Sequence, residues 1–167
     1  MPDSSTPTPA EGERRATAAL TASGIAFTTT RHGRVASLAE AAALRGVEPR
    51  DIVKTLVVRR GEDDYLFVLV PGDREFSWPK LRALLAVSRL SMPGAEEARS
   101  VTGYERGTIT PFGASHPWPV IADADVVGRV ISMGAGGHGV AVTVDADAII
   151  AALGAQVADI ADPMASS

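Results

Sequence analysis

The sequence predicts an α+β domain with a mixed, mostly antiparallel and barrel-like sheet surrounded by helices. Strand-type and helix-type segments follow one another without the regular alternation of βαβ units, which disfavours an all-parallel sheet. The 167 residues, 46% hydrophobic and 22% charged, suit one ordinary globular core. We expect a disordered leader at residues 1–10, a single domain over 11–160 and a short tail at 161–167.

Helices are predicted where a capping residue precedes, or a glycine follows, a helix-forming stretch. Ser37 and Glu40 have the spacing of a capping box, in which each side chain bonds to backbone at the helix start. Gly24 and Gly46 lack a Cβ and suit the left-handed turn that ends a helix. Such signals predict helices over about 11–22 and 38–45, after Ser77, over about 95–101 and after Asp145.

Strands are predicted from runs of β-branched and aromatic residues. Val53–Val58 and Tyr65–Val70 flank the turn-forming residues 61–64, which is the pattern of an antiparallel hairpin with a buried centre. Further strands are expected at 25–32, 108–109, 120–122, 129–132 and 140–144.

Composition excludes several classes of protein. The absence of cysteine removes disulfides, thiol nucleophiles and thiolate metal sites. No apolar run approaches the roughly 20 residues of a membrane-spanning helix, and the N-terminal segment lacks the apolar core of a signal peptide. The net charge of −4 argues against a protein that grips long stretches of nucleic acid. We therefore expect a soluble cytoplasmic protein that contacts neither a membrane nor DNA.

Lys54 interrupts the apolar run Val53–Val58 and shares a strand face with Leu56 and Val58. A buried ammonium costs several kcal/mol unless an anion or another acceptor replaces its lost water. Two interpretations stay open: the ammonium binds a ligand, or it simply reaches water from the end of the strand.

Two glycine-rich segments can bring backbone groups close to a ligand. In Gly103–Gly113, amides and carbonyls can act as fixed dipoles toward a reacting ester, and a plain connection between helix and hairpin is the alternative. Gly134–Gly139 matches GxGxxG, but a strand-type segment follows it where a dinucleotide-binding fold requires a helix. We interpret it as a hairpin loop that borders a pocket or merely turns the chain.

The remaining polar residues form no recognised catalytic pattern. His32, His116 and His138 are scattered, without the spacing of metal ligands. No GxSxG elbow marks a nucleophilic serine. Asp123 and Asp125 follow a strand and can supply a carboxylate, although turn-forming aspartates are commoner. We expect no metal and no cofactor.

Taken together, these segments resemble the YbaK/ProX family of aminoacyl-tRNA deacylases, which also occurs as the editing insertion of bacterial prolyl-tRNA synthetases. The resemblance covers about residues 14–154. It lies in the order of five segments: Gly24–Phe27 with His32 downstream, Val53–Val58, the GYxxGxxxPFG loop Gly103–Gly113, Val120–Asp123, and Gly136-Gly137 before a terminal strand and helix.

The resemblance implies hydrolysis of mischarged tRNA, whose acceptor end enters a pocket and whose ribose 2′-hydroxyl takes part. It implies that Lys54 holds the terminal adenosine or its phosphate, and that Gly107 and Pro111 belong to a loop that positions the ester. These three are the candidate catalytic residues. The candidate substrate-binding residues are Phe27, His32, Thr55, Gly103, Tyr104, Phe112, Gly113, Asp123, Gly136, Gly137 and His138, with Leu44 a further candidate for lining the side-chain pocket.

The resemblance also implies the partners. Cys-tRNA(Pro) and Ala-tRNA(Pro) are the candidate substrates, and prolyl-tRNA synthetase is the candidate protein partner. Many relatives have a basic residue in the last glycine loop, so His138 is expected to alter amino-acid choice or tRNA contact. The rival function is a non-catalytic module that binds a nucleotide, a tRNA end or a synthetase, and a metal-dependent hydrolase is a more distant alternative.

Overall fold

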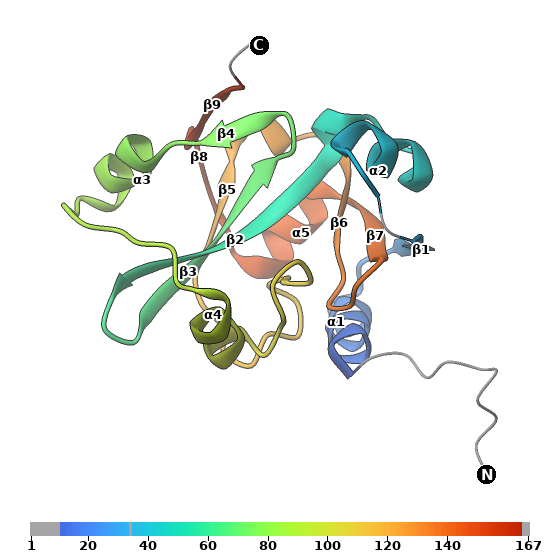
Figure 1. Ribbon diagram of the computed structural model, residues 1–167, viewed down its shortest axis with the longest axis horizontal. Helices are drawn as coiled ribbons and strands as arrows, with labels where there is room; N and C mark the ends of the chain where they lie inside the picture. Colours follow the sequence, from blue (N-terminus) through green and yellow to red (C-terminus); the bar gives the residue numbers. More distant parts are fainter. Residues whose placement is uncertain (1–10, 34, 165–167) are drawn as a thin grey trace.

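A computed structural model describes residues 11–33 and 35–164 (Figure 1). The leader expected at residues 1–10 lies outside the described residues. The helices are α1 (Glu11–Ala22), α2 (Leu38–Arg45), α3 (Trp78–Leu85), α4 (Ala95–Thr102) and α5 (Ala146–Leu153), with short 3-10 helices at Pro49–Asp51 and Ala124–Val126. The strands are β1 (Phe27–Arg31), β2 (Ile52–Gly61), β3 (Asp64–Pro71), β4 (Arg74–Phe76), β5 (Val120–Asp123), β6 (Val130–Gly134), β7 (Val140–Asp145), β8 (Gln156–Ala158) and β9 (Ala161–Pro163).

The predicted helices are confirmed, and their caps explain where they begin and end. Ser37 Oγ accepts a hydrogen bond from Glu40 N (3.1 Å) at the start of α2. The Glu40 carboxylate reaches back to accept from Ala36 N (3.1 Å), one residue before the position that a capping box uses. Gly46 then adopts a left-handed φ of +72° and ends α2.

The strand predicted at residues 108–109 is wrong. Thr108 N donates to Glu105 O (3.0 Å), and the Thr108 hydroxyl donates to the same oxygen (2.7 Å), so this segment is a turn. Thr108 O accepts from Gly136 N (3.0 Å). The backbone of Thr108 is thus satisfied without a neighbouring strand.

The main sheet is mixed and has the strand order β1-β7-β6-β2-β3-β5-β8. Pairs β1–β7, β6–β7 and β2–β3 are antiparallel, whereas β2–β6, β3–β5 and β5–β8 are parallel. The α+β class is therefore confirmed, but β1 and β8 are opposite edges, so the sheet is open and does not close into a barrel (Figure 1). A second sheet pairs β4 with β9, and β9 lies within residues 161–167, the segment expected to be a short tail.

Apolar side chains cover both faces of the β2–β3 hairpin, as the alternation of strand side chains requires. Val57 belongs to a cluster with Leu20 of α1 and Ile149 of α5. Val58, the next residue, belongs to a cluster with Leu81 of α3. Figure 1 shows α5 behind the sheet and α2 at the upper right, beside the start of β2. The hairpin with a buried centre is confirmed.

Asp123 ties the end of β5 to the C-terminal strands. Its carboxylate is 1% exposed and accepts from Asp125 N and Ile160 N, both at 3.1 Å. The carboxylate also lies 3.6 Å from Arg74 Nε of β4. This network gives a buried charge the partners that its desolvation requires.

Replacing Asp123 tests that network. We expect Asp123→Ala to lower the free energy of unfolding by about 3–5 kcal/mol, because two backbone N–H groups lose their acceptor and a half-buried guanidinium loses its ion-pair partner. The control Asp125→Ala removes a half-buried carboxylate 3.3 Å from Arg129 Nη2 and should cost about 1 kcal/mol or less. Urea denaturation measures the free energy of unfolding of both variants. Equal losses would show that the Asp123 network does not stabilise the fold more than the Asp125 ion pair does.

Candidate active site

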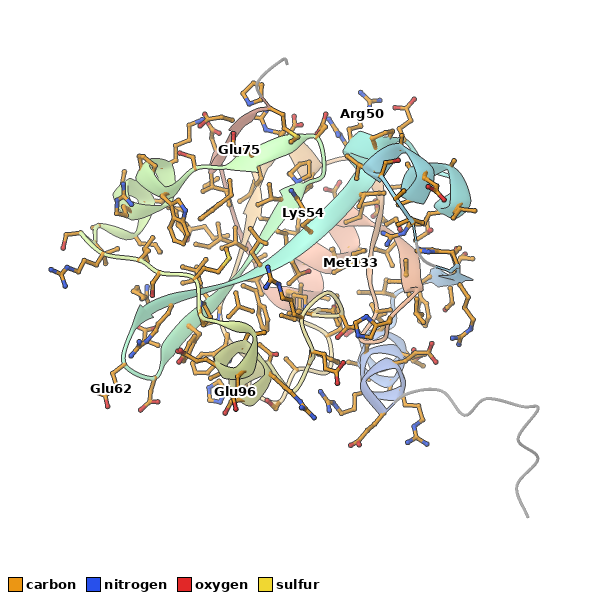
Figure 2. All side chains as sticks on the ribbon, viewed as in Figure 1. Arg50, Lys54, Glu62, Glu75, Glu96 and Met133 are labelled. Carbon is orange, nitrogen blue, oxygen red and sulfur yellow. The ribbon has the colours of Figure 1, made fainter. Side chains whose placement is uncertain are left out.

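Lys54 is exposed on β2, near the centre of the view in Figure 2. It lies opposite Val70 of β3, and its face-sharing neighbours Leu56 and Val58 pack in the cluster around Leu81. The predicted strand face is therefore confirmed, and the ammonium reaches water. Within the described residues, the ion pairs include no carboxylate partner for Lys54. Its charge is available to an external anion.

Strands β2 and β6 separate next to Lys54. Their parallel pairing joins Ile52 to Ser132 and Val53 to Met133. The pairing goes no further, although β2 continues for eight more residues to Gly61. Lys54 is thus the first residue of β2 beyond the shared ladder, and Figure 2 shows it on the strand beside Met133. Within the described residues, the edge of β2 that faces β6 forms no further pairing until Arg59, whose backbone bonds to Ser91.

The predicted loop with Gly107 and Pro111 lies beside the end of β6. An ideal Cβ built on Gly134, the last residue of β6, would lie 3.8 Å from Ile109 O. Gly107 is exposed and has a φ of +88°, a conformation that favours glycine, and Pro111 is half-buried. The structure therefore brings this loop to the place where β2 and β6 separate.

The two glycine loops contact each other. Gly136 N donates to Thr108 O (3.0 Å), which joins the backbones of the loops. At their outer rim, His138 Nε2 lies 3.2 Å from Glu105 Oε2, and both side chains are exposed. Residues 103–113 and 134–139 therefore form one wall, which we call the double-loop wall.

Tyr104 anchors the double-loop wall from inside. Its ring is 1% exposed, and its hydroxyl donates to Phe112 O (2.6 Å). Arg15 of α1 stacks over the ring, with its guanidinium carbon 4.7 Å from the ring centroid, and donates to Gly103 O (3.0 Å) and Gly113 O (3.2 Å). Burial raises the pKa of the Tyr104 phenol. Four residues predicted to bind substrate, Gly103, Tyr104, Phe112 and Gly113, are thus joined in a buried scaffold.

Gly136 lets the second loop approach α1. Its φ is +85°, and a Cβ at this position would collide with Gly12 O and lie 2.9 Å from Tyr104 Cε1. Only a residue without a side chain fits between the start of α1 and the tyrosine ring. Gly136 therefore acts through close packing of the backbone.

His32 meets Arg45 at the other side of the gap. Arg45 Nε donates to His32 Nε2 (3.2 Å), and Arg45 Nη1 donates to Ser132 Oγ of β6 (3.4 Å). His32 N donates to Gly139 O (2.9 Å), which joins this group to the double-loop wall. Sequence reasoning missed Arg45 and Ser132, because an arginine in the last turn of a helix and a serine in a strand carry no distinctive signal.

Other predicted site residues lie apart from Lys54. Phe27 of β1 is three strands away from β2, or about 14 Å at the usual strand spacing, and packs against the cluster around Leu20. Asp123 is two strands away on the other side and is engaged by backbone N–H groups. Thr55 faces the opposite side of β2 from Lys54, and its buried hydroxyl has no partner within the described residues.

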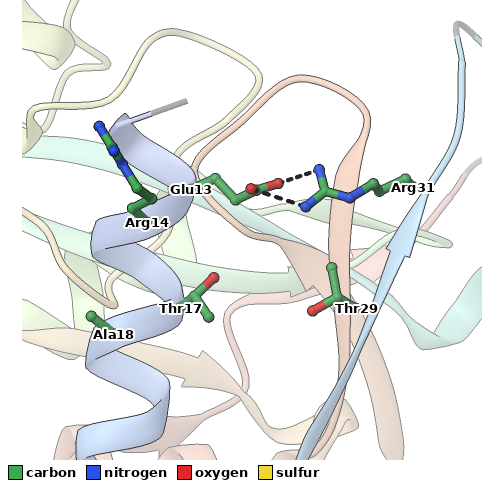
Figure 3. Close-up of a pocket in the computed structure, with 6 residues that line it drawn as sticks. All are labelled: Glu13, Arg14, Thr17, Ala18, Thr29 and Arg31. Carbon is green, nitrogen blue, oxygen red and sulfur yellow. Dashed lines mark hydrogen bonds and ion pairs between the residues drawn. The ribbon is translucent and has the colours of Figure 1, made fainter. Parts of the chain in front are cut away.

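A separate shallow groove lies between α1 and β1 (Figure 3). Arg31 and the buried Glu13 form a two-bonded ion pair across it, at 2.5 and 3.0 Å. The groove is also lined by Arg14, Thr17, Ala18 and Thr29. None of the predicted site residues lines it, so we place the candidate site at the gap between β2 and β6.

Membrane-spanning helices and metal-binding clusters are both absent from the described residues. No helix there is long and apolar enough to cross a membrane. Across residues 11–33 and 35–164, His, Asp and Glu do not gather in groups of three or more that are able to hold a metal ion.

The sequence is related to a known family. Residues 32–152 match the family described as the aminoacyl-tRNA editing domain, and the chain belongs to that family. The match includes Lys54, the double-loop wall and the group around Arg45. The resemblance drawn from the sequence is confirmed.

Individual relatives support the same family assignment. The chain is 37% identical over 92 residues to proline–tRNA ligase of Thermosipho melanesiensis, a match that covers 55% of this chain and 16% of the ligase. It is 40% identical over 80 residues to proline–tRNA ligase of Thermosipho africanus, covering 48% of this chain and 14% of that ligase. The chain thus spans a small part of the length of these relatives.

Solved structures share the fold over nearly the whole chain. A crystal structure described as a candidate trans-editing enzyme for prolyl tRNA synthetase superposes with a TM-score of 0.83 at 28% identity, covering 93% of this chain and 99% of that one. The structure of hypothetical protein APE2540 superposes with a TM-score of 0.80 at 25% identity, covering 89% and 99%. The predicted fold class is confirmed by these likenesses.

Gly136→Ala tests the close packing of the double-loop wall. We expect a loss of about 2–5 kcal/mol in the free energy of unfolding, from left-handed strain and from collision with the Gly12 backbone. Gly154→Ala is the matched control: φ there is +61°, and a Cβ would meet open space, so only strain of about 1–2 kcal/mol is expected. Chemical denaturation compares the two, and an equal loss would show that the Gly136 contact is unimportant.

Proposed function

We propose that this chain is a trans-editing hydrolase that cleaves the ester between a wrongly attached amino acid and the 3′ end of a tRNA. One observation carries the proposal: an exposed lysine, which pairs with no carboxylate among the described residues, lies where β2 and β6 separate, beside a loop of backbone dipoles. An aminoacyl ester at the end of an anionic RNA strand presents a carbonyl next to phosphates. A cation can bind the phosphates, and fixed dipoles can stabilise the carbonyl oxygen.

The loop of residues 107–111 supplies the dipoles. The amides of Gly107 and Ile109 donate to no acceptor within residues 11–33 and 35–164. In hydrolysis, water attacks the ester carbonyl carbon, and negative charge develops on the carbonyl oxygen, where backbone N–H groups stabilise it. The bond from that carbon to the ribose oxygen then breaks. The ribose hydroxyl leaves with a proton, and the amino acid leaves as a carboxylate.

The candidate catalytic residues have distinct roles in this proposal. Lys54 binds the terminal adenosine or its phosphate and so positions the ester. Gly107 allows the loop its left-handed turn, and Pro111 restricts the backbone of the residue before it. The ribose 2′-hydroxyl of the substrate helps to orient the attacking water, which fits a site without a serine triad.

Family relationships support the choice of tRNA. The matched relatives include proline–tRNA ligases, so we propose tRNA(Pro) carrying cysteine or alanine as the substrate and prolyl-tRNA synthetase as the protein partner. Such a substrate places the protein in the cytoplasm, where translation occurs. His138, at the rim of the double-loop wall, is proposed to contact the amino acid or the acceptor stem.

Deacylation of a panel of mischarged tRNAs tests the proposal. Wild type is expected to release the amino acid selectively from Cys-tRNA(Pro) or Ala-tRNA(Pro) among Cys-, Ala-, Ser- and Thr-charged tRNAs. Lys54→Ala is expected to lower kcat/KM by about 10- to 100-fold, the usual effect of losing one charged hydrogen bond. Release of radiolabelled amino acid gives both numbers.

Lys80→Ala is the matched control. It removes the only other lysine, whose ammonium pairs with Asp159 and Asp162 on the surface, and should leave kcat/KM within about twofold. RNA binding without release from any tRNA would favour the non-catalytic module. Loss of activity in EDTA would favour a metal-dependent hydrolase.

A further inference from the structure

Two hydrogen bonds fix the side chain of Arg45, but no carboxylate among the described residues pairs with its charge. It is half-buried at the end of α2, where desolvation lowers the pKa of its guanidinium. The groups that it contacts, His32 Nε2 and Ser132 Oγ, are both neutral acceptors. Because His32 Nε2 accepts, the proton of the neutral ring belongs on Nδ1, which faces Gly33 O at 2.8 Å.

Two other partly buried arginines in the described part of the chain face carboxylates. Arg74 lies 3.6 Å from Asp123, and Arg129 lies 3.3 Å from Asp125. The ion pairs among residues 11–33 and 35–164 include none for Arg45. A desolvated guanidinium without an anion is unfavourable, and a planar fork with unused N–H donors is the group that binds phosphate best in proteins.

Arg45 and Lys54 border the same gap. Ser132, which Arg45 contacts, is directly opposite Ile52 in the β2–β6 ladder. Lys54 is two residues beyond Ile52, so its side chain leaves the same face of β2 about 7 Å along the strand. The two cations therefore flank the opening at which β2 and β6 separate, and within the described residues neither has a carboxylate partner.

We propose that Arg45 is a phosphate-binding residue of the editing site, holding a backbone phosphate of the tRNA 3′ strand beside the group bound by Lys54. His32 and Ser132 are positioning residues that fix the guanidinium toward the gap. The inference rests on the proposed function for the identity of the RNA. Its test uses binding of uncharged tRNA, which requires no hydrolysis.

The salt dependence of binding counts phosphate contacts directly. A single-stranded contact contributes a slope of about −0.7 in log K against log salt. With uncharged tRNA(Pro), Arg45→Gln is expected to make the slope shallower by about 0.7 and to weaken binding about tenfold. Arg45→Lys should restore the slope but not the full affinity, because the charge returns without the guanidinium fork. Arg60→Gln, at the far end of β2, removes the same charge and should change neither value by as much.

A second variant leaves Arg45 in place. His32→Glu provides a carboxylate next to the guanidinium and should also make the slope shallower by about 0.7, since the cation is then neutralised internally. Thermal unfolding verifies that each variant is folded. An unchanged slope in Arg45→Gln and His32→Glu, or no binding of tRNA by wild type, would overturn the inference. If wild type hydrolyses no ester but the slopes change as expected, the proposed hydrolysis fails while the role of Arg45 in binding stands.

Discussion

The packing of Tyr104 beneath Arg15 holds together the parts of the chain that surround Lys54. The tyrosine is buried, so its hydroxyl must have a partner, and Phe112 O provides it at 2.6 Å. Arg15 covers the ring and bonds to carbonyls on both sides of the loop, which otherwise would lack donors. An irregular loop of low intrinsic order is thereby fixed to a helix. Fixed backbone groups are what an editing site without side-chain nucleophiles requires.

The sheet provides the opening that this scaffold borders. Parallel pairing between β2 and β6 ends after Val53 and Met133, and the double-loop wall lies beside the end of β6. The separation of two strands, rather than a deep cavity, therefore marks the candidate site.

Local charge explains how an acidic chain can bind an anionic strand. The net charge is −4, but many carboxylates are paired with arginine or lysine away from the gap, as in Arg60–Asp64 and Lys80–Asp159. Lys54 and Arg45 have no such partners in the described part of the chain, so the field at the gap is positive over short range. Under the proposed function, such local charge favours contact with one end of an RNA over contact along its length.

Much of this protein follows from local sequence, because caps, turns and side-chain alternation act over a few residues. Ser37, Gly46 and the alternation along β2 predicted α2 and the central hairpin, and Lys54 with the Gly103–Gly113 loop predicted the family. Other features depend on contacts between distant segments. Thr108 ends a turn whose carbonyl Gly136 satisfies, and Arg45 contacts Ser132 of β6 because α2 packs there. No local sequence pattern predicts which distant carbonyl or strand will contact a given residue, so only the tertiary structure decides these features.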